Sequence, residues 1–161
     1  MKRVLLLFLA LSALLCGVSC ETAQEEPDKN YVFQVGNVTV SVDDGAETIL
    51  TALGQWKDYN ESPSCAFEGL DKIYVYNGFR IQTYTLSGVD YIRSVELTDD
   101  SVSTPEGIAV GASAEAVLDA YGEPKTKTDS ALVYENTEKG MKLQFILRDG
   151  KVTNIQYLKN I

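Results

Sequence analysis

The second half of the chain repeats a pattern that the first half already contains. The stretch 47–57 (ETILTALGQWK) matches 115–125 (EAVLDAYGEPK) at a constant offset of 68 residues. Three further blocks recur in the same order at offsets of about 60 to 63 residues: 72–74 with 132–134, 78–82 with 140–144, and Val89, Ile92 and Val95 with Val152, Ile155 and Leu158. Four ordered matches indicate a duplication, so we expect one structural unit built twice.

Each copy opens with the pattern of a short helix. Apolar residues recur at helical spacing after Asp44 in the first copy and after Ser113 in the second. Asp44 with Glu47 three residues later has the form of a capping box, and Ser113 is followed by Glu115 in the first turn. A glycine after each apolar run, Gly54 or Gly122, suits the left-handed position that ends many helices.

Three strands are expected to follow each helix, because apolar and polar residues alternate between tight-turn signals. The turns are Asn77-Gly78, Ser87-Gly88, Lys139-Gly140 and Asp149-Gly150. A hairpin of 31–35 and 38–42 precedes the first copy, and a longer loop, 59–70, interrupts it. The sequence therefore predicts an α+β fold of two tandem helix-plus-antiparallel-meander modules, 31–100 and 101–161, with the helices packed on one face of the sheet.

The second copy resembles a known family. Gly107, Gly111, Ser113, Tyr121-Gly122 and Pro124 precede a strand with Tyr134, then Gly140-x-x-Leu143-x-Phe145 and Asp149-Gly150-Lys151-Val152. This order is similar to one module of the β-lactamase-inhibitor-protein-like (BLIP-like) superfamily, whose module also resembles that of the small outer-membrane lipoprotein of the β-barrel assembly machinery. The likeness covers 107–158 well and 36–97 more weakly, with Trp56 where the second copy has Pro124. It implies helices on one sheet face and a protein partner on the opposite, concave face.

The N-terminus predicts export. Lys2 and Arg3 precede the uncharged run 4–15, which has the length of a secretory signal core and is too short to span a bilayer. Gly17-Val18-Ser19-Cys20 resembles the lipobox of bacterial lipoproteins, although Gly17 stands where leucine is usual. We expect 1–20 to be a signal ending at a lipidated Cys20, with an ordinary secretory signal as the alternative. The polar, acidic stretch 21–30 then reads as a flexible linker, so the protein would be lipid-anchored on the extracytoplasmic face of the cell membrane.

Charge and composition narrow the function classes. The chain has no histidine, which excludes Ser-His-Asp and Cys-His catalysis and the ordinary zinc sites. Without Lys2 and Arg3, 12 basic residues face 23 acidic ones, a net charge of about −11, which disfavours nucleic acid and anionic membrane surfaces as partners. We expect no metal, no cofactor and no catalytic residue. Acidic pairs such as Asp99-Asp100 read as solvated turns.

One cysteine and one face of the predicted sheet remain as candidates. Cys65 is the one cysteine after Cys20; it is expected to be buried and inert, with pairing between chains as the alternative. Alternation along the strands predicts that Ile73, Val75, Phe79, Ile81 and Thr83 face the core. The opposite, solvent-facing side would carry the candidate partner-binding residues: Tyr74, Tyr76, Arg80, Gln82, Tyr84, Lys142 and Gln144. Tyrosine also favours ordinary strand surfaces, so plain sheet surface is the alternative.

The sequence thus predicts a non-catalytic lipoprotein that binds a protein or another cell-envelope component. The alternatives are a structural component of an envelope assembly and, less favoured, a hydrolase that uses acidic residues alone. The membrane would be contacted through the lipid anchor only.

Overall fold

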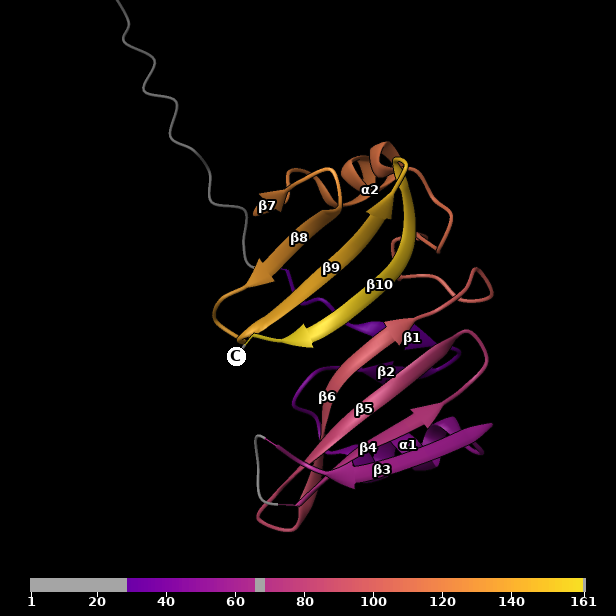
Figure 1. Ribbon diagram of the computed structural model, residues 1–161, viewed down its shortest axis with the longest axis vertical. Helices are drawn as coiled ribbons and strands as arrows, with labels where there is room; N and C mark the ends of the chain where they lie inside the picture. Colours follow the sequence, from indigo (N-terminus) through magenta and orange to yellow (C-terminus); the bar gives the residue numbers. More distant parts are fainter. Residues whose placement is uncertain (1–28, 66–68, 161) are drawn as a thin grey trace, which may run out of the picture.

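The computed structural model describes residues 29–65 and 69–160 (Figure 1). The expected signal, the lipidation site Cys20 and nearly all of the expected linker lie outside the described residues. Within the described part, neither helix is long and apolar enough to cross a bilayer.

Ten strands and two short helices make up the described chain. In order they are β1 (Phe33–Val35), β2 (Val38–Val40), α1 (Ala46–Leu53), β3 (Asp58–Pro63), β4 (Leu70–Val75), β5 (Phe79–Leu86), β6 (Val89–Leu97), α2 (Ala114–Tyr121), β7 (Thr126–Lys127), β8 (Ala131–Asn136), β9 (Met141–Arg148) and β10 (Lys151–Lys159). The four predicted turn dipeptides connect β4 to β5, β5 to β6, β8 to β9 and β9 to β10, as expected. The predicted first hairpin is also confirmed as β1 and β2.

Eight strands form one continuous antiparallel sheet in the order β3-β4-β5-β6-β10-β9-β8-β7. The N-terminal half of the sheet is the meander β3 to β6, and the C-terminal half is the meander β7 to β10. The two halves join where β6 pairs with β10, from Leu97 opposite Ile155 to Ser94 opposite Leu158. Figure 1 shows the two halves one above the other, with the sheet twisting between them.

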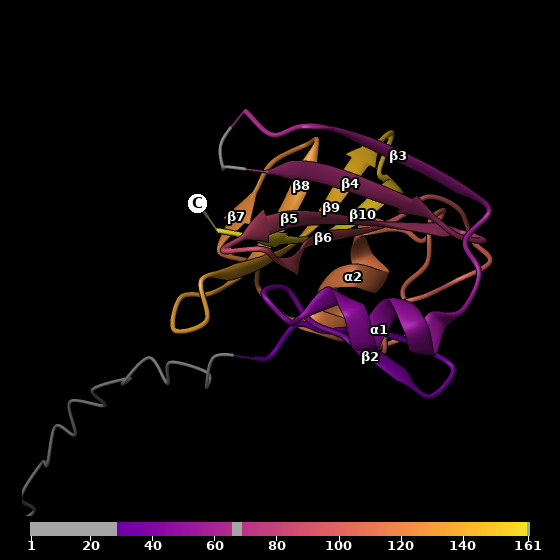
Figure 2. The same ribbon diagram turned by 90° about the horizontal axis from the view of Figure 1, so that it is seen from below.

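Both helices and the β1–β2 hairpin lie on the same side of this sheet (Figure 2). The hairpin covers the centre: Phe33 packs on Phe79 of β5 at 4.9 Å between ring centroids, and on Tyr157 of β10 at 6.2 Å. The most deeply buried side chains come largely from the strands, among them Ile81, Val95, Leu143 and Ile155. We call this covered side the core face and the opposite side the open face.

The prediction of an α+β fold made of two helix-plus-meander modules is wrong. Strands make up 50% of the structure and helices only 12%, so the fold is dominated by the antiparallel sheet. Each helix has eight residues and buries only two side chains, Ala46 and Ile49 in α1 and Val117 and Tyr121 in α2. A helix of two turns is marginal on its own, so the cross-strand pairing of the sheet contributes most of the folded framework.

The predicted loop and the predicted helix ends are confirmed in part. The predicted loop 59–70 is partly the edge strand β3, whose six side chains are all exposed, so it carries no alternating apolar pattern. Ser113 caps α2, since its hydroxyl accepts a hydrogen bond from the Ala116 amide at 3.2 Å. The predicted capping box at Asp44 is wrong, because α1 begins after Gly45 without a side-chain cap. The helices end at Gly54 and Gly122, as predicted, and both residues have a positive φ, 77° and 79°; their ψ angles of −151° and −157° are extended, so the predicted left-handed helical conformation is wrong.

Candidate functional site

The open face can be read from the strand register. In an antiparallel sheet, directly opposed residues project on the same side. One row across the sheet consists of Val75, Arg80, Glu96, Gln156, Gln144 and Val133, and the next consists of Ile73, Gln82, Ser94, Leu158, Lys142 and Glu135. All twelve side chains are half-buried or exposed. Four predicted partner-binding residues, Arg80, Gln82, Lys142 and Gln144, therefore lie together on one surface that crosses both halves.

The prediction that Tyr74 and Tyr76 face solvent is wrong. They are 7% and 8% exposed, because Tyr74 stands opposite Ile81 and points to the core face, and Tyr76 stacks on Phe79 at 4.9 Å. Ile73 and Val75, expected in the core, instead lie on the open face. The predicted alternation of β4 is correct, but its two faces lie the other way round, because tyrosine rather than the aliphatic residues of this strand fills the core.

Tyr84 is also buried, at 4% exposure, and does not offer a contact surface. Its hydroxyl donates to Asp43 Oδ1 at 2.9 Å, and Lys159 lies over its ring, 5.3 Å from the centroid. Burial together with the bond to Asp43 raises its pKa, and the neighbouring Lys159 only partly opposes this. Tyr84 therefore ties the turn before α1 to the end of β10, a structural role.

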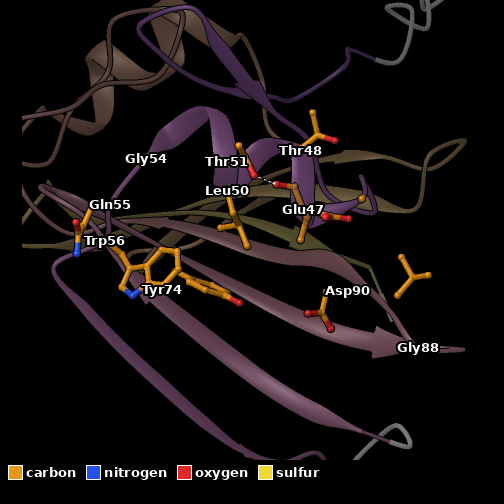
Figure 3. Close-up of a pocket in the computed structure, with 13 residues that line it drawn as sticks. Glu47, Thr48, Leu50, Thr51, Gly54, Gln55, Trp56, Tyr74, Gly88 and Asp90 are labelled. Atoms are coloured by element: carbon orange, nitrogen blue, oxygen red, sulfur yellow. Dashed lines mark hydrogen bonds between the residues drawn. The ribbon is translucent and has the colours of Figure 1, made fainter.

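A second surface was not predicted from the sequence. A groove of about 830 Å³ opens on the core-face side, between α1 and the strands β4 to β6 (Figure 3). We call it the α1 groove; Gly45, Glu47, Leu50, Trp56, Tyr74 and Asp90 are among the residues that line it. Figure 3 shows Trp56 and Tyr74 at one end, Leu50 of α1 above Tyr74, and Asp90 towards the other end. One difference between the two copies points to this groove in the sequence: Trp56 lines it, and the second copy has Pro124 at the same place.

The aromatic end of the groove is partly open to solvent. Trp56 is 39% exposed and Tyr59 38% exposed, although the rings of both contact Tyr74, at 5.1 Å and 5.0 Å. The planes of Trp56 and Tyr74 meet at 72°, so the two rings form a corner. Large exposed aromatic side chains beside a concave surface are typical of binding sites, because they offer much apolar contact area at little conformational cost.

The other end of the groove is polar. Asp90 Oδ2 accepts from Lys72 Nζ at 2.6 Å, and Oδ1 accepts from the Thr85 hydroxyl at 2.6 Å. Burial opposes ionisation of Asp90, but these two hydrogen bonds outweigh it and lower its pKa. The bond to Asp90 is also the largest cause of the raised pKa of Lys72. A general acid needs a raised pKa, so Asp90 does not have the property expected of a general acid.

Cys65 is exposed and not paired within the described chain, so the expectation of a buried thiol is wrong; it follows an exposed edge strand rather than a core segment. No group of three or more acidic or cysteine side chains in residues 29–65 and 69–160 is arranged to hold a metal ion.

The comparisons with known proteins add no relative. No family model, curated protein or solved structure matches the chain. The resemblance to the BLIP-like superfamily therefore remains a prediction from the motif residues alone.

Proposed function

We propose that the protein is a lipid-anchored extracytoplasmic module that binds a protein partner on the open face of its sheet. The observation that supports this is the surface crossed by the two registered rows. It combines half-buried aliphatic side chains, such as Ile73, Val75 and Leu158, with the long polar side chains of Arg80 and Lys142. Apolar contact area with a central arginine is the composition of many protein interfaces.

The open face is also held in a fixed shape. Arg80 of β5 forms an ion pair with Glu96 of β6, and Asn154 of β10 donates to Glu96 Oε1 at 2.6 Å. This chain of contacts links the two halves of the sheet across the β6–β10 junction. A surface that is already ordered loses less conformational entropy when a partner binds, which favours binding.

Site-specific crosslinking in the native membrane tests the proposal. A photoreactive residue replaces Gln82 or Gln144 on the open face, or, as the control, Asp119 on the exposed side of α2. We expect one discrete crosslinked species from both open-face positions and none from Asp119, and we expect Leu158→Asp to remove it. Equal products from all three positions would contradict the assignment of the face.

The anchor needs its own experiment. Metabolic labelling with a fatty-acid analogue is expected to mark the wild-type protein and not Cys20→Ala. Equal labelling of both would remove the tether from the proposal and leave the open-face interaction to be judged by crosslinking alone.

A further inference from the structure

We propose that the α1 groove is a second binding site, for a small organic ammonium ion that carries an apolar body. The site lies on the opposite side of the sheet from the open face, so it is independent of the partner interaction proposed above. Its two ends differ in chemistry, with aromatic rings at one end and carboxylates towards the other (Figure 3). A ligand that fits both ends must itself have an apolar end and a cationic end.

The apolar end of such a ligand has a defined place. The corner formed by Trp56 and Tyr74 lies below Leu50 of α1, and the groove volume of about 830 Å³ is within the range of small-molecule sites. An apolar group in this corner would be removed from water and would also cover part of the exposed Trp56 ring, which is 39% exposed, and both changes favour binding. The electron-rich ring faces also attract a cation or its polarised C–H groups, and tryptophan does so most strongly.

The charge of the groove selects a cation for the other end. Glu47 and Asp90 both line it, and none of the residues that line it is basic. The whole chain carries a formal net charge of −9, so the surrounding field also attracts cations and repels anions. An ammonium group can therefore approach Glu47 without meeting a competing positive side chain in the groove lining.

The structure also contains an example of the contact that we propose. The ammonium group of Lys72 already lies 2.6 Å from Asp90 Oδ2, beside the groove, with 21% of its side chain exposed. This pair shows that the polar end accepts an alkylammonium on a carboxylate. Because Lys72 occupies one oxygen of Asp90, it also competes with a ligand for that carboxylate. Removal of Lys72 should therefore strengthen binding, whereas removal of Glu47 should weaken it.

Intrinsic fluorescence gives a direct test, since Trp56 is the one tryptophan of the chain. The probes are 2-phenylethylamine, which is an ammonium ion at pH 7, and 2-phenylethanol, which has the same apolar body without the charge. We expect the amine to change the Trp56 emission saturably, and to bind about fivefold more tightly than the alcohol, as one exposed ion pair allows. The difference should shrink at high ionic strength.

Two variants locate the cationic end while leaving Trp56 in place. Glu47→Gln should weaken amine binding about threefold, the scale of an exposed ion pair, and leave the alcohol unchanged. Lys72→Gln should tighten amine binding by a similar factor. The matched control is Glu123→Gln, an exposed residue that follows α2 and corresponds to Gln55 in the repeat, and it should change neither. Circular dichroism checks that each variant is folded.

The proposal fails on any of three results. Equal affinity for the amine and the alcohol would leave only an apolar groove. Weaker amine binding by Lys72→Gln would mean that Lys72 and the ligand do not compete for Asp90. Tighter binding of a neutral oligosaccharide than of the amine would show that the aromatic corner recognises sugar rings instead.

Discussion

The two halves of the sheet share the same backbone hydrogen bonds at the start of their helices, but their side chains pack differently between helix and sheet. Before α1, the amide of Asp43 donates to Ile92 O at 2.8 Å and the amide of Ile92 donates to Asp44 O at 2.9 Å. The same two hydrogen bonds recur before α2. The amide of Gly111 donates to Val152 O at 2.7 Å, and the amide of Val152 donates to Ala112 O at 2.9 Å. Both pairs of bonds tie the start of a helix to the last strand of its own half.

The two halves differ at the residues that follow these hydrogen bonds. In the C-terminal half, the Ala114 amide donates to Gly150 O at 3.0 Å, so the β9–β10 turn closes against the start of α2. The corresponding residues of the N-terminal half, Ala46 and Gly88, instead line the α1 groove. One backbone plan therefore gives a closed half and a half with a groove.

The aromatic residues follow the same division. In the C-terminal half, Tyr121 packs on Tyr134 and Phe145, and all three rings are buried. Tyr31, near the start of the described chain, packs on both Tyr121 and Tyr134. In the N-terminal half, Trp56 and Tyr59 keep more than a third of their surface in solvent. The closed half is thus suited to stability and the grooved half to binding.

The largest expected effect tests this division by stability. Phe145→Ala in the closed half removes a fully buried ring and should lower the free energy of unfolding by about 3–5 kcal/mol. Trp56→Ala in the grooved half removes a partly exposed ring and should cost about 1 kcal/mol, the scale of its aromatic contacts. Urea unfolding of both variants measures the two values. Equal losses would mean that Trp56 is a core residue rather than part of a binding surface.

The sequence predicted the connections better than the surfaces. Gly78, Gly88, Gly140 and Gly150 all have positive φ, which few other residues adopt readily, so the turns could be located from dipeptides. The faces of β4 could not be assigned in the same way, because Tyr74 and Ile73 are equally good strand residues and only the pairing with Ile81 decides between them. The α1 groove depends on the spacing between a helix and a hairpin, which no local pattern encodes.

Alkaline pH should destabilise the protein, in part through the buried tyrosines of the closed half. Burial raises the pKa of Tyr134 to about 12, and it also raises the pKa of Tyr121 and Tyr157. The unfolded value is about 10, so the unfolded chain loses these protons first. The stability from the neutral hydroxyls is complete below pH 10 and declines as the pH rises towards 12.

Unfolding in urea at pH 8, 10 and 11 measures this decline. Tyr134→Phe should show a shallower loss between pH 10 and 11, and a cost of about 1 kcal/mol at pH 8 because the hydroxyl no longer donates to Gly122 O. A variant with the same pH dependence as the wild-type protein would show that Tyr134 does not contribute to it.

A smaller effect is expected from the cap of α2. Ser113→Ala removes the hydroxyl that accepts from the Ala116 amide and should lower the free energy of unfolding by about 1 kcal/mol. Ser130→Ala in the exposed turn between β7 and β8 is a control for the loss of a serine hydroxyl outside a helix cap. A cost at Ser113 no greater than at Ser130 would contradict a role for the cap in closing this half.

The smallest predicted effect supplies the N-terminal half with the cap that it lacks. Gly45 precedes α1 with φ −61° and ψ 124°, an extended conformation that serine adopts readily, and a Cβ atom placed there meets no atom within 4 Å. Gly45→Ser should therefore raise the free energy of unfolding by a few tenths of a kcal/mol, about the difference between glycine and serine at this position. Paired urea titrations of Gly45→Ser and Ser113→Gly should show effects of opposite sign and similar size. A destabilised Gly45→Ser would mean that the start of α1 needs glycine for a reason other than its backbone, and that the two helix starts are not equivalent.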